Sequence, residues 1–204
     1  MDVLILDRTI SSEMISKRQE LGHDRCDEVW DGVYVMSPMA NNEHQRIVAK
    51  CCSAILDVVG EAATVLPGAN VSDRNDDWIM NYRCPDVVVV LPGCTAIDRT
   101  THWQGGPDFL IEVRSRDDDT YKKLSFYAGL GVREVLVVER DSRLPALYRL
   151  GRTKLSLVKP TEIDGLLLVA SQVLPLAFRT VIAKSREPRL EVRRIAGRKK
   201  TWLI

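Results

Sequence analysis

The sequence of 204 residues predicts an α/β (α+β) fold in which helices flank a mixed β-sheet. Hydrophobic residues recur at helical spacing in residues 10–21, 42–59 and 117–130, and the segments between and after them contain short β-branched runs. Several strands lie between successive helices, and this order favours a mixed sheet over a strict alternation of single strands and helices. The length is sufficient for one domain with a full hydrophobic core.

Boundary signals support the hairpin and the long helix in the first third of the chain. Asp31-Gly32 lies between two short apolar runs, which is the sequence pattern of a tight β-hairpin. In the helix at 42–59, Asn42 and Gln45 resemble a capping box at the start, and Gly60 follows the end.

The expected strands are short and are bounded by turn residues such as Pro92-Gly93. They lie at 28–30, 33–36, 63–66, 86–91, 108–114, 135–138, 146–150, 154–158, 165–170 and 176–182. Gly131 closes the helix at 117–130, and the strand at 146–150 is expected to pair with the one at 135–138.

Positive charge is concentrated at the C-terminal end of the chain. The whole sequence has a formal charge of +1, but residues 184–204 contain eight Lys and Arg and two Glu, a net charge of +6. We therefore expect a single domain at 1–183 followed by a basic C-terminal extension at 184–204. This extension is interpreted as a solvated, partly disordered tail, and a role in phosphate contacts is the alternative.

Other features argue against a membrane or secreted protein. No run approaches the ~18 apolar residues of a transmembrane helix, and Met1-Asp2-Val3-Leu4 lacks the basic and apolar regions of a secretory signal. The five cysteines are odd in number and have no C-x-x-C spacing, which indicates neither a disulfide framework nor a zinc site. The expected location is the cytoplasm, with no membrane partner.

Two acidic residues interrupt apolar strands. Asp86 opens the run Val87–Val90, and Glu112 lies within Phe109–Arg114. An unpaired charge is costly to bury, so carboxylates in such strands suggest a functional site. The alternatives are a turn residue for Asp86 and, for Glu112, a solvated edge strand with an ion pair to Arg114.

Three further residues are candidates for the same site. Lys123 follows Glu112 by 11 residues and shares a helix face with Tyr127, so it can lean toward Glu112 if that face lies on the sheet. His44 lies near the start of a helix and off its apolar stripe, and a surface or capping histidine is the alternative interpretation. Glu28, before the hairpin turn, has less support than His44.

These residue types suit the hydrolysis of a phosphodiester. The carboxylates of Asp86 and Glu112 can hold Mg²⁺ or Mn²⁺, which polarises a phosphoryl oxygen and activates bound water. Lys123 can orient that water and offset the developing negative charge. The sequence has neither a Gly-rich phosphate loop nor a nucleophilic Ser or Cys elbow.

The candidate residues belong to short motifs that follow one another in a definite order. These are Glu28 with Asp31-Gly32, Met36-Ser37-Pro38, His44-Gln45-Arg46-Ile47, Pro85-Asp86, Glu112-Val113, Lys123-x-x-x-Tyr127, Gly131-Val132-Arg133-Glu134 and Ser171-Gln172-Val173-Leu174-Pro175. Over about residues 20–183, this pattern resembles the Uma-two family of restriction endonuclease-like proteins, in the PD-(D/E)XK nuclease superfamily.

The resemblance implies a restriction endonuclease-like core, DNA as the substrate and often a homodimer. It also implies that Asp86 and Glu112 are the metal ligands, with Mg²⁺ or Mn²⁺ as the cofactor, that Lys123 is the catalytic lysine, and that His44 is an accessory residue. One position departs from the superfamily pattern, because Arg114 stands where a lysine is usual. Arginine stays protonated and cannot act as a base.

Three functions remain open from the sequence. The first is a divalent-metal-dependent endonuclease that hydrolyses DNA phosphodiester bonds. The second, which Arg114 mildly favours, is a catalytically inactive nucleic-acid-binding or regulatory module with the same fold. The third is a dimeric interaction protein in which the acids are structural. Stabilisation by a divalent ion discriminates between them, because only a metal site responds to the ion.

Overall fold

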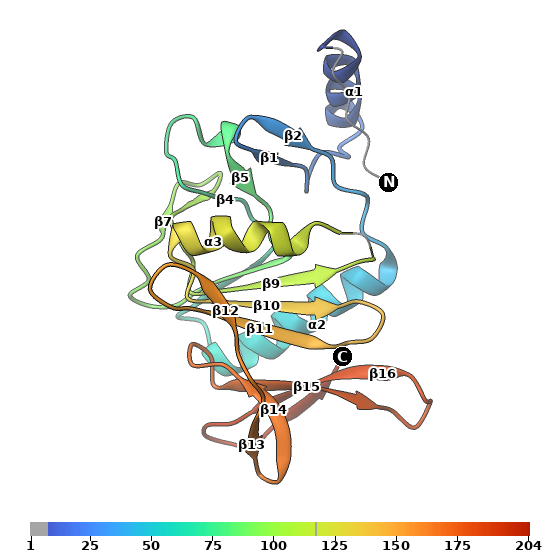
Figure 1. The fold of residues 1–204 in the computed structure, drawn as a ribbon, viewed down its shortest axis with the longest axis vertical. Coiled ribbons are helices and arrows are strands. Elements are labelled where there is room, and N and C mark those ends of the chain that lie inside the picture. Colours follow the sequence, from blue (N-terminus) through green and yellow to red (C-terminus); the bar gives the residue numbers. More distant parts are fainter. Residues whose placement is uncertain (1–7, 117) are drawn as a thin grey trace.

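A computed structural model describes residues 8–116 and 118–204. The described residues form three β-sheets and a small number of helices, which Figure 1 shows as stacked layers. This mixed architecture is consistent with a restriction endonuclease-like fold and confirms the predicted fold class. Asp117, the first residue of the expected second long helix, lies outside the described residues.

The central sheet has six strands in the order β12-β11-β10-β9-β6-β3. Their bounds are β3 Thr64–Pro67, β6 Val87–Val90, β9 Phe109–Arg114, β10 Glu134–Glu139, β11 Pro145–Leu150 and β12 Leu155–Leu157. Strands β9 and β10 are parallel, and the remaining neighbours are antiparallel. The sheet is therefore mixed, and the expected pairing of β10 with β11 is confirmed.

A second sheet lies above the central one in Figure 1, in the order β2-β1-β5-β4-β8-β7. Its strands are β1 Glu28–Trp30, β2 Val33–Val35, β4 Val71–Ser72, β5 Tyr82–Arg83, β7 Ile97–Asp98 and β8 Trp103–Gln104, and a 3-10 turn, η1, covers Trp78–Met80. Positive φ angles of 49° at Asp31 and 84° at Gly32 make the predicted tight hairpin.

The helices are α1 Arg8–Glu20, α2 Asn42–Val59 and α3 Leu124–Leu130. For α2 the predicted range is confirmed, but the cap lies one residue earlier, because the Asn41 side chain accepts a hydrogen bond from the His44 N–H. The second long helix is shorter than predicted, since its first turn is a 3-10 turn, η2, at Thr120–Lys123. Gly131 ends α3 with a positive φ, as expected.

The two faces of the central sheet pack into separate hydrophobic cores. Ile111 and Val113 of β9 lie in a core with α2 and the third sheet. Leu110 lies on the opposite face, in a core with Tyr127 of α3. Alternation along the strand places Glu112 on the α3 side, as the sequence predicts. This alternation directs the carboxyl toward the face on which Lys123 lies.

The third sheet is an antiparallel meander that includes the C-terminal residues. Its strands are β13 Thr161–Ile163, β14 Leu166–Ala170, β15 Leu176–Ile182, β16 Pro188–Arg194 and β17 Thr201–Leu203. Strand β16 pairs with β15 along its whole length, and Leu190 and Ile204 are buried in the α2 core. The prediction of a solvated tail at 184–204 is therefore wrong, because apolar residues alternate with its charges and turn toward the core.

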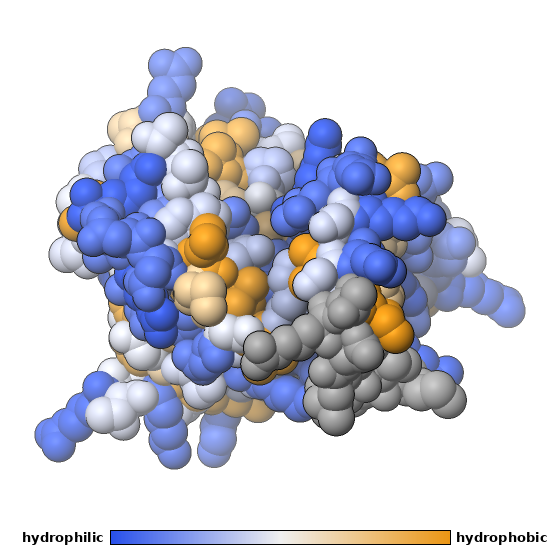
Figure 2. All heavy atoms as spheres, turned by 90° about the horizontal axis from the view of Figure 1, so that it is seen from above, coloured by the Kyte–Doolittle hydropathy of each residue, from blue (hydrophilic) through white to orange (hydrophobic). Residues whose placement is uncertain are grey.

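One face of the molecule is predominantly polar. The side of the molecule shown in Figure 2 is mostly hydrophilic, and hydrophobic residues lie there in small separate groups. Within the described ranges, none of the helices has the length and apolar character needed to cross a membrane.

Candidate active site

Asp86 and Glu112 lie opposite each other at the edge of a strand pair. Strands β6 and β9 are antiparallel with Val87 opposite Ile111, so continuing this register by one residue places Asp86 opposite Glu112. One oxygen of Asp86, Oδ2, accepts a hydrogen bond of 2.6 Å from the main-chain N–H of Val113. The pairing of two distant strands thus brings together the two acids that the sequence singles out.

Lys123 reaches the same carboxylate from the helical side. Lys123 is the last residue of η2, and its Nζ lies 3.4 Å from both carboxylate oxygens of Glu112. The hydroxyl of Tyr127, one helical turn further on, also donates a hydrogen bond to Glu112. The structure therefore brings Asp86, Glu112 and Lys123 to one place, and Tyr127 packs beneath them as expected.

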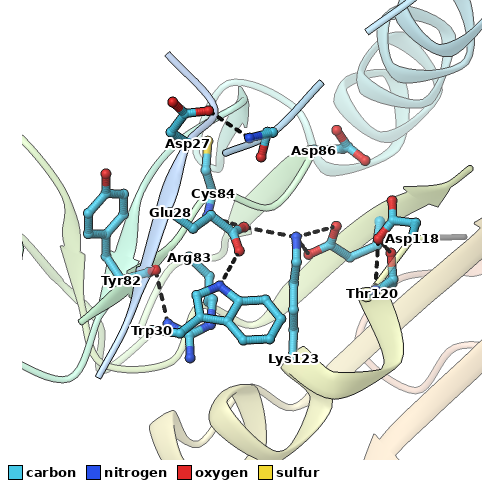
Figure 3. A network of polar contacts seen from close by, with 12 residues as sticks. Asp27, Glu28, Trp30, Tyr82, Arg83, Cys84, Asp86, Asp118, Thr120 and Lys123 are labelled. Atoms are coloured by element: carbon cyan, nitrogen blue, oxygen red, sulfur yellow. Dashed lines mark hydrogen bonds and ion pairs between the residues drawn. The ribbon is translucent and has the colours of Figure 1, made fainter. Parts of the chain in front are cut away.

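Glu28 also belongs to the cluster, although its support from the sequence was weaker than that of His44. Its Oε1 lies 2.8 Å from Lys123 Nζ, so one lysine joins two carboxylates, and Figure 3 shows Lys123 extending toward Glu28. Trp30 Nε1 and the Cys84 N–H donate further hydrogen bonds of 2.6 and 2.9 Å to Glu28. The available signal was a charged residue in a short apolar strand, and Glu28 is only 2% exposed.

His44 lies at the same site through contact with Asp86. Its Nε2 is 3.2 Å from Asp86 Oδ1, and the Asn41 cap fixes the first turn of α2 from which it projects. Burial lowers the pKa of His44, but the hydrogen bond and the charge of Asp86 outweigh burial, so the pKa is raised. His44 thus joins the cluster through one carboxylate, while Asp86 Oδ2 is engaged with the backbone.

The cluster contains three carboxyl groups, those of Glu28, Asp86 and Glu112, but only one lysine, Lys123. Burial is the largest influence on the pKa of Glu112 and raises it, Lys123 lowers it, and the charges of Asp86 and Glu28 raise it, so that the net pKa is about 8. Burial lowers the pKa of Lys123, but the charges of Glu112 and Glu28 outweigh burial and raise it, so the ammonium stays charged. The site therefore has more carboxyl groups than its lysine can neutralise, and a bound cation would favour the ionised form of Glu112.

Arg114 does not take part in this cluster. Its Nη1 lies 3.2 and 3.0 Å from the two carboxylate oxygens of Glu139, and its guanidinium lies over the ring of Tyr121. The alternative interpretation of Glu112, an edge residue paired with Arg114, is wrong, because β9 is an interior strand and Glu112 is buried. The cation beside Glu112 is Lys123, which comes from a different element.

An arginine-rich cavity of about 380 Å³ borders the cluster. It is lined by Glu43, Arg46, Arg140, Asp141, Arg143, Glu187, Pro188 and Arg189. Glu43 directly precedes His44 in α2, and the charge of Arg140 acts on the His44 imidazole. Arg140 also donates a hydrogen bond of 3.1 Å to Ser115, just beyond the end of β9. Four arginines against three acids leave this cavity with an excess of positive charge.

The donor set fits a hard divalent cation. Mg²⁺ is commonly bound through one or two carboxylates together with waters and substrate phosphates, which are all oxygen ligands. Asp86 and Glu112 supply such oxygens on adjacent strands. In the part of the chain that the structure describes, no cluster of three or more His, Cys, Asp and Glu side chains is arranged as a metal cage. The fit therefore concerns a site built from two carboxylates.

Comparison with known proteins identifies the family of the chain. A search of curated proteins found no match to the chain. The family model described as "Uma2: Putative restriction endonuclease" matches residues 18–183, which include all the residues of the cluster. The match confirms the resemblance found from the motifs, and its end at residue 183 leaves β16 and β17 outside it. Because the match covers most of the chain, the chain belongs to the Uma2 family of restriction endonuclease-like proteins.

Proposed function

We propose that this protein is a divalent-metal-dependent endonuclease that hydrolyses phosphodiester bonds in DNA. The observation that carries the proposal is the convergence of Asp86, Glu112 and Lys123 from two strands and a helical turn. Membership of a restriction endonuclease-like family supports the reaction class. A cluster of carboxylates with one buried ammonium is suited to holding a cation against a phosphate group.

The two strand carboxylates hold the metal in this proposal. Asp86 and Glu112 would bind Mg²⁺ or Mn²⁺, which when bound polarises the phosphoryl oxygen and makes coordinated water more nucleophilic. The Val113 N–H and His44 orient Asp86 by contacting one oxygen each. The Tyr127 hydroxyl performs the same task for Glu112. Such orienting contacts matter because a metal ligand must be presented in one geometry.

Lys123 acts as a charged group in this proposal. Its ammonium, held between Glu28 and Glu112, stabilises the negative charge that develops on the phosphate in the transition state. Glu28 positions that ammonium and does not itself contact the substrate. The raised pKa of Lys123 excludes it as the base in the state described, so the loss of a proton from water would rely on a bound cation, which would lower the pKa of coordinated water.

The arginine cavity is the proposed contact surface for the DNA backbone. Arg46, Arg140 and Arg189 line it, and arginine pairs with phosphate through two parallel hydrogen bonds. A strand whose scissile phosphate lies at Glu112 could continue over this cavity. The homodimer that the family resemblance implies and the cytoplasmic location expected from the sequence belong to the same proposal.

The experiment that tests the activity is cleavage of supercoiled plasmid with Mg²⁺ or Mn²⁺. We expect nicking by the wild type, loss of at least about 100-fold in Glu112→Gln and Lys123→Ala, and no change in Glu162→Gln on the exposed strand β13. Equal cleavage by all four proteins would indicate a contaminant or a different site.

Binding of the metal is tested separately from cleavage. At 100 times its dissociation constant, Mn²⁺ should stabilise the wild type by about 2.7 kcal/mol, and Asp86→Asn should lose this effect. If Mn²⁺ stabilises neither protein, the metal site is wrong. If the wild type binds DNA but is inert with either metal, the catalytically inactive binding module replaces the endonuclease as the best interpretation.

A further inference from the structure

Cys26 and Cys84 are two thiols beside the candidate active site that the proposed hydrolysis does not use. They come from separate parts of the chain, since Cys26 lies two residues before β1 and Cys84 directly follows β5. Both are free cysteines, and Cys26 is exposed whereas Cys84 is buried. Cys84 also lies two residues before Asp86 in the sequence. A covalent change at this cysteine pair would therefore affect the chain segments that carry Glu28 and Asp86.

Strand pairing and side-chain contacts place the two thiols against each other. Strands β1 and β5 are antiparallel with Val29 opposite Tyr82, so continuing the register by two residues places Cys84 opposite Asp27, next to Cys26. Independently, Cys84 Sγ lies 3.9 Å from the carbonyl oxygen of Arg25, the residue before Cys26. The residues on both sides of Cys26 therefore lie against Cys84 in the folded chain.

Buried polar contacts hold both backbone segments in this arrangement. The N–H of Cys84 donates to Glu28 at 2.9 Å, and the Asp27 carboxylate accepts from Arg18 Nε and from the Ser37 N–H, each at 2.7 Å. Asp27 is 1% exposed, so these bonds are shielded from water. A disulfide requires Cα atoms roughly 4.4–6.8 Å apart, and paired strands lie roughly 4.7–4.9 Å apart, so the pairing of β1 with β5 brings the two backbone segments to a comparable separation.

We propose that Cys26 and Cys84 form an oxidation site that closes to a disulfide when the protein meets a peroxide. The exposed Cys26 sulfur attacks the peroxide, an S–O bond forms, the O–O bond breaks, and the thiol proton leaves in a molecule of water. The Cys84 sulfur then attacks Cys26 Sγ, the S–S bond forms, and the S–O bond breaks as hydroxide, which takes the Cys84 proton. The two thiols are oxidised by two electrons, and one hydrogen peroxide is reduced to two waters.

The remaining cysteines occupy different surroundings and serve as internal references. Cys51 lies in the core formed by α2, and Cys94 Sγ lies 3.7 Å from the Gly106 carbonyl oxygen. The proposed bond joins the segment before Glu28 to the segment before Asp86, so it cross-links two parts of the candidate site. The modification is a property of the folded chain and does not depend on the proposed nuclease activity.

The test is a disulfide map of the full-length protein. The reduced chain, freed of reductant and of divalent ions, is treated with hydrogen peroxide and digested with trypsin without reduction. We expect residues 26–46 linked to residues 84–99 by mass spectrometry, with titratable thiols falling from five to three. Because residues 84–99 also contain Cys94, the digest is repeated with Cys94→Ser, which should form the same cross-link.

Cys26→Ser is the matched variant, because an exposed residue is changed and the core is left intact. It should keep its four remaining thiols under the same treatment. Three results would overturn the proposal: a wild type that keeps five thiols, Cys26 oxidised to a sulfinic acid while Cys84 stays reduced, or a bond between the Cys26 residues of two chains. Plasmid cleavage measured on the same samples separates this outcome from failure of the proposed function.

Discussion

At the residue scale, the buried carboxyl of Glu112 has the most perturbed environment of the acids in the candidate site. It is 4% exposed and faces two other carboxylates and one ammonium. Desolvation disfavours the ionised form, so in the metal-free protein Glu112 holds its proton to about pH 8. A cation at the site must displace that proton, which couples metal binding to pH.

This raised pKa predicts how the stability of the metal-free protein changes with pH. The Glu112 pKa moves from 4.5 to about 8 on folding, so between these values the folded state holds a proton that the unfolded state has released. Stability is therefore highest below the unfolded value and falls as the pH rises through about 8. Glu112→Gln lacks this titration. Thermal melts from pH 5 to 9 without divalent ions should show the wild type losing stability relative to the variant, and parallel profiles would contradict the assignment.

Lys123 is predicted to stabilise the fold as well as to serve the reaction. Replacing it by methionine leaves Glu28 and Glu112 buried beside each other without their shared cation. Breaking such a buried pair costs about 3–5 kcal/mol, and the loss should be larger at pH 9 than at pH 6, where Glu112 is protonated. Urea unfolding measures the effect.

The neighbouring lysine provides the control for that experiment. Lys122 pairs with Asp119 on the surface and is 63% exposed, so Lys122→Met should change stability by less than about 1 kcal/mol. Equal losses in the two variants would mean that the Lys123 pair has no special energetic role.

At the scale of elements, the unexpected feature is the pair of C-terminal strands. Strand β16 carries three of the eight Lys and Arg residues of the expected tail, yet Leu190 and Val192 alternate with its charged residues and face the core. Glu191 between them accepts from Arg179 and Arg193, which balances part of that charge within the sheet. A strand in which charged and apolar residues alternate thus lies between β15 and β17 in the third sheet.

We predict that this strand contributes to stability. Leu190→Ala removes a fully buried side chain and should lower the free energy of unfolding by about 2–5 kcal/mol. Leu203→Ala, in the same C-terminal segment but 54% exposed, should change it by about 0.5 kcal/mol or less. Denaturant titration of the two variants is the measurement, and a small loss in both would restore the interpretation of 184–204 as a tail.

At the scale of the whole molecule, the net charge is small, but acidic and basic side chains are concentrated in different places. The net charge is only +1, but acids gather at the Glu112 cluster and arginines line the adjoining cavity. The cavity is formed by the start of α2, the β10–β11 turn and the β15–β16 turn, which lie at the same end of the molecule in Figure 1. Such an arrangement attracts a polyanion to the place where a cation is held.

DNA binding through this cavity predicts a specific salt dependence. Each neutralised phosphate contributes about 0.9 to the slope of log affinity against log salt concentration, so Arg46→Ala and Arg189→Ala should each reduce the slope by about 1. Arg99→Ala, on β7–β8 at the other end of the molecule, should leave it unchanged. Binding is measured without divalent ions, so cleavage does not interfere. Equal slopes in all variants would place the DNA elsewhere.

How much of this could be predicted is clearest from individual residues. The hairpin at Asp31-Gly32 and the range of α2 follow from local rules, because turn conformation and helical spacing depend on neighbours in the sequence. The candidate acids Asp86 and Glu112 could be found because each is a charge in an apolar strand. Glu28 is the same kind of residue, but its strand is only three residues long and its signal is correspondingly weak.

By itself, then, the sequence determined the mixed fold class, most strands of the central sheet, and the set of acids, lysine and histidine that carries the family resemblance. The tertiary structure alone decided the partners: Lys123 rather than Arg114 beside Glu112, and Cys84 beside Cys26. It also decided that the basic C-terminal segment is a strand. The physical reason is that periodicity and capping act over a few residues, whereas ion pairing and burial depend on the register between strands far apart in the chain.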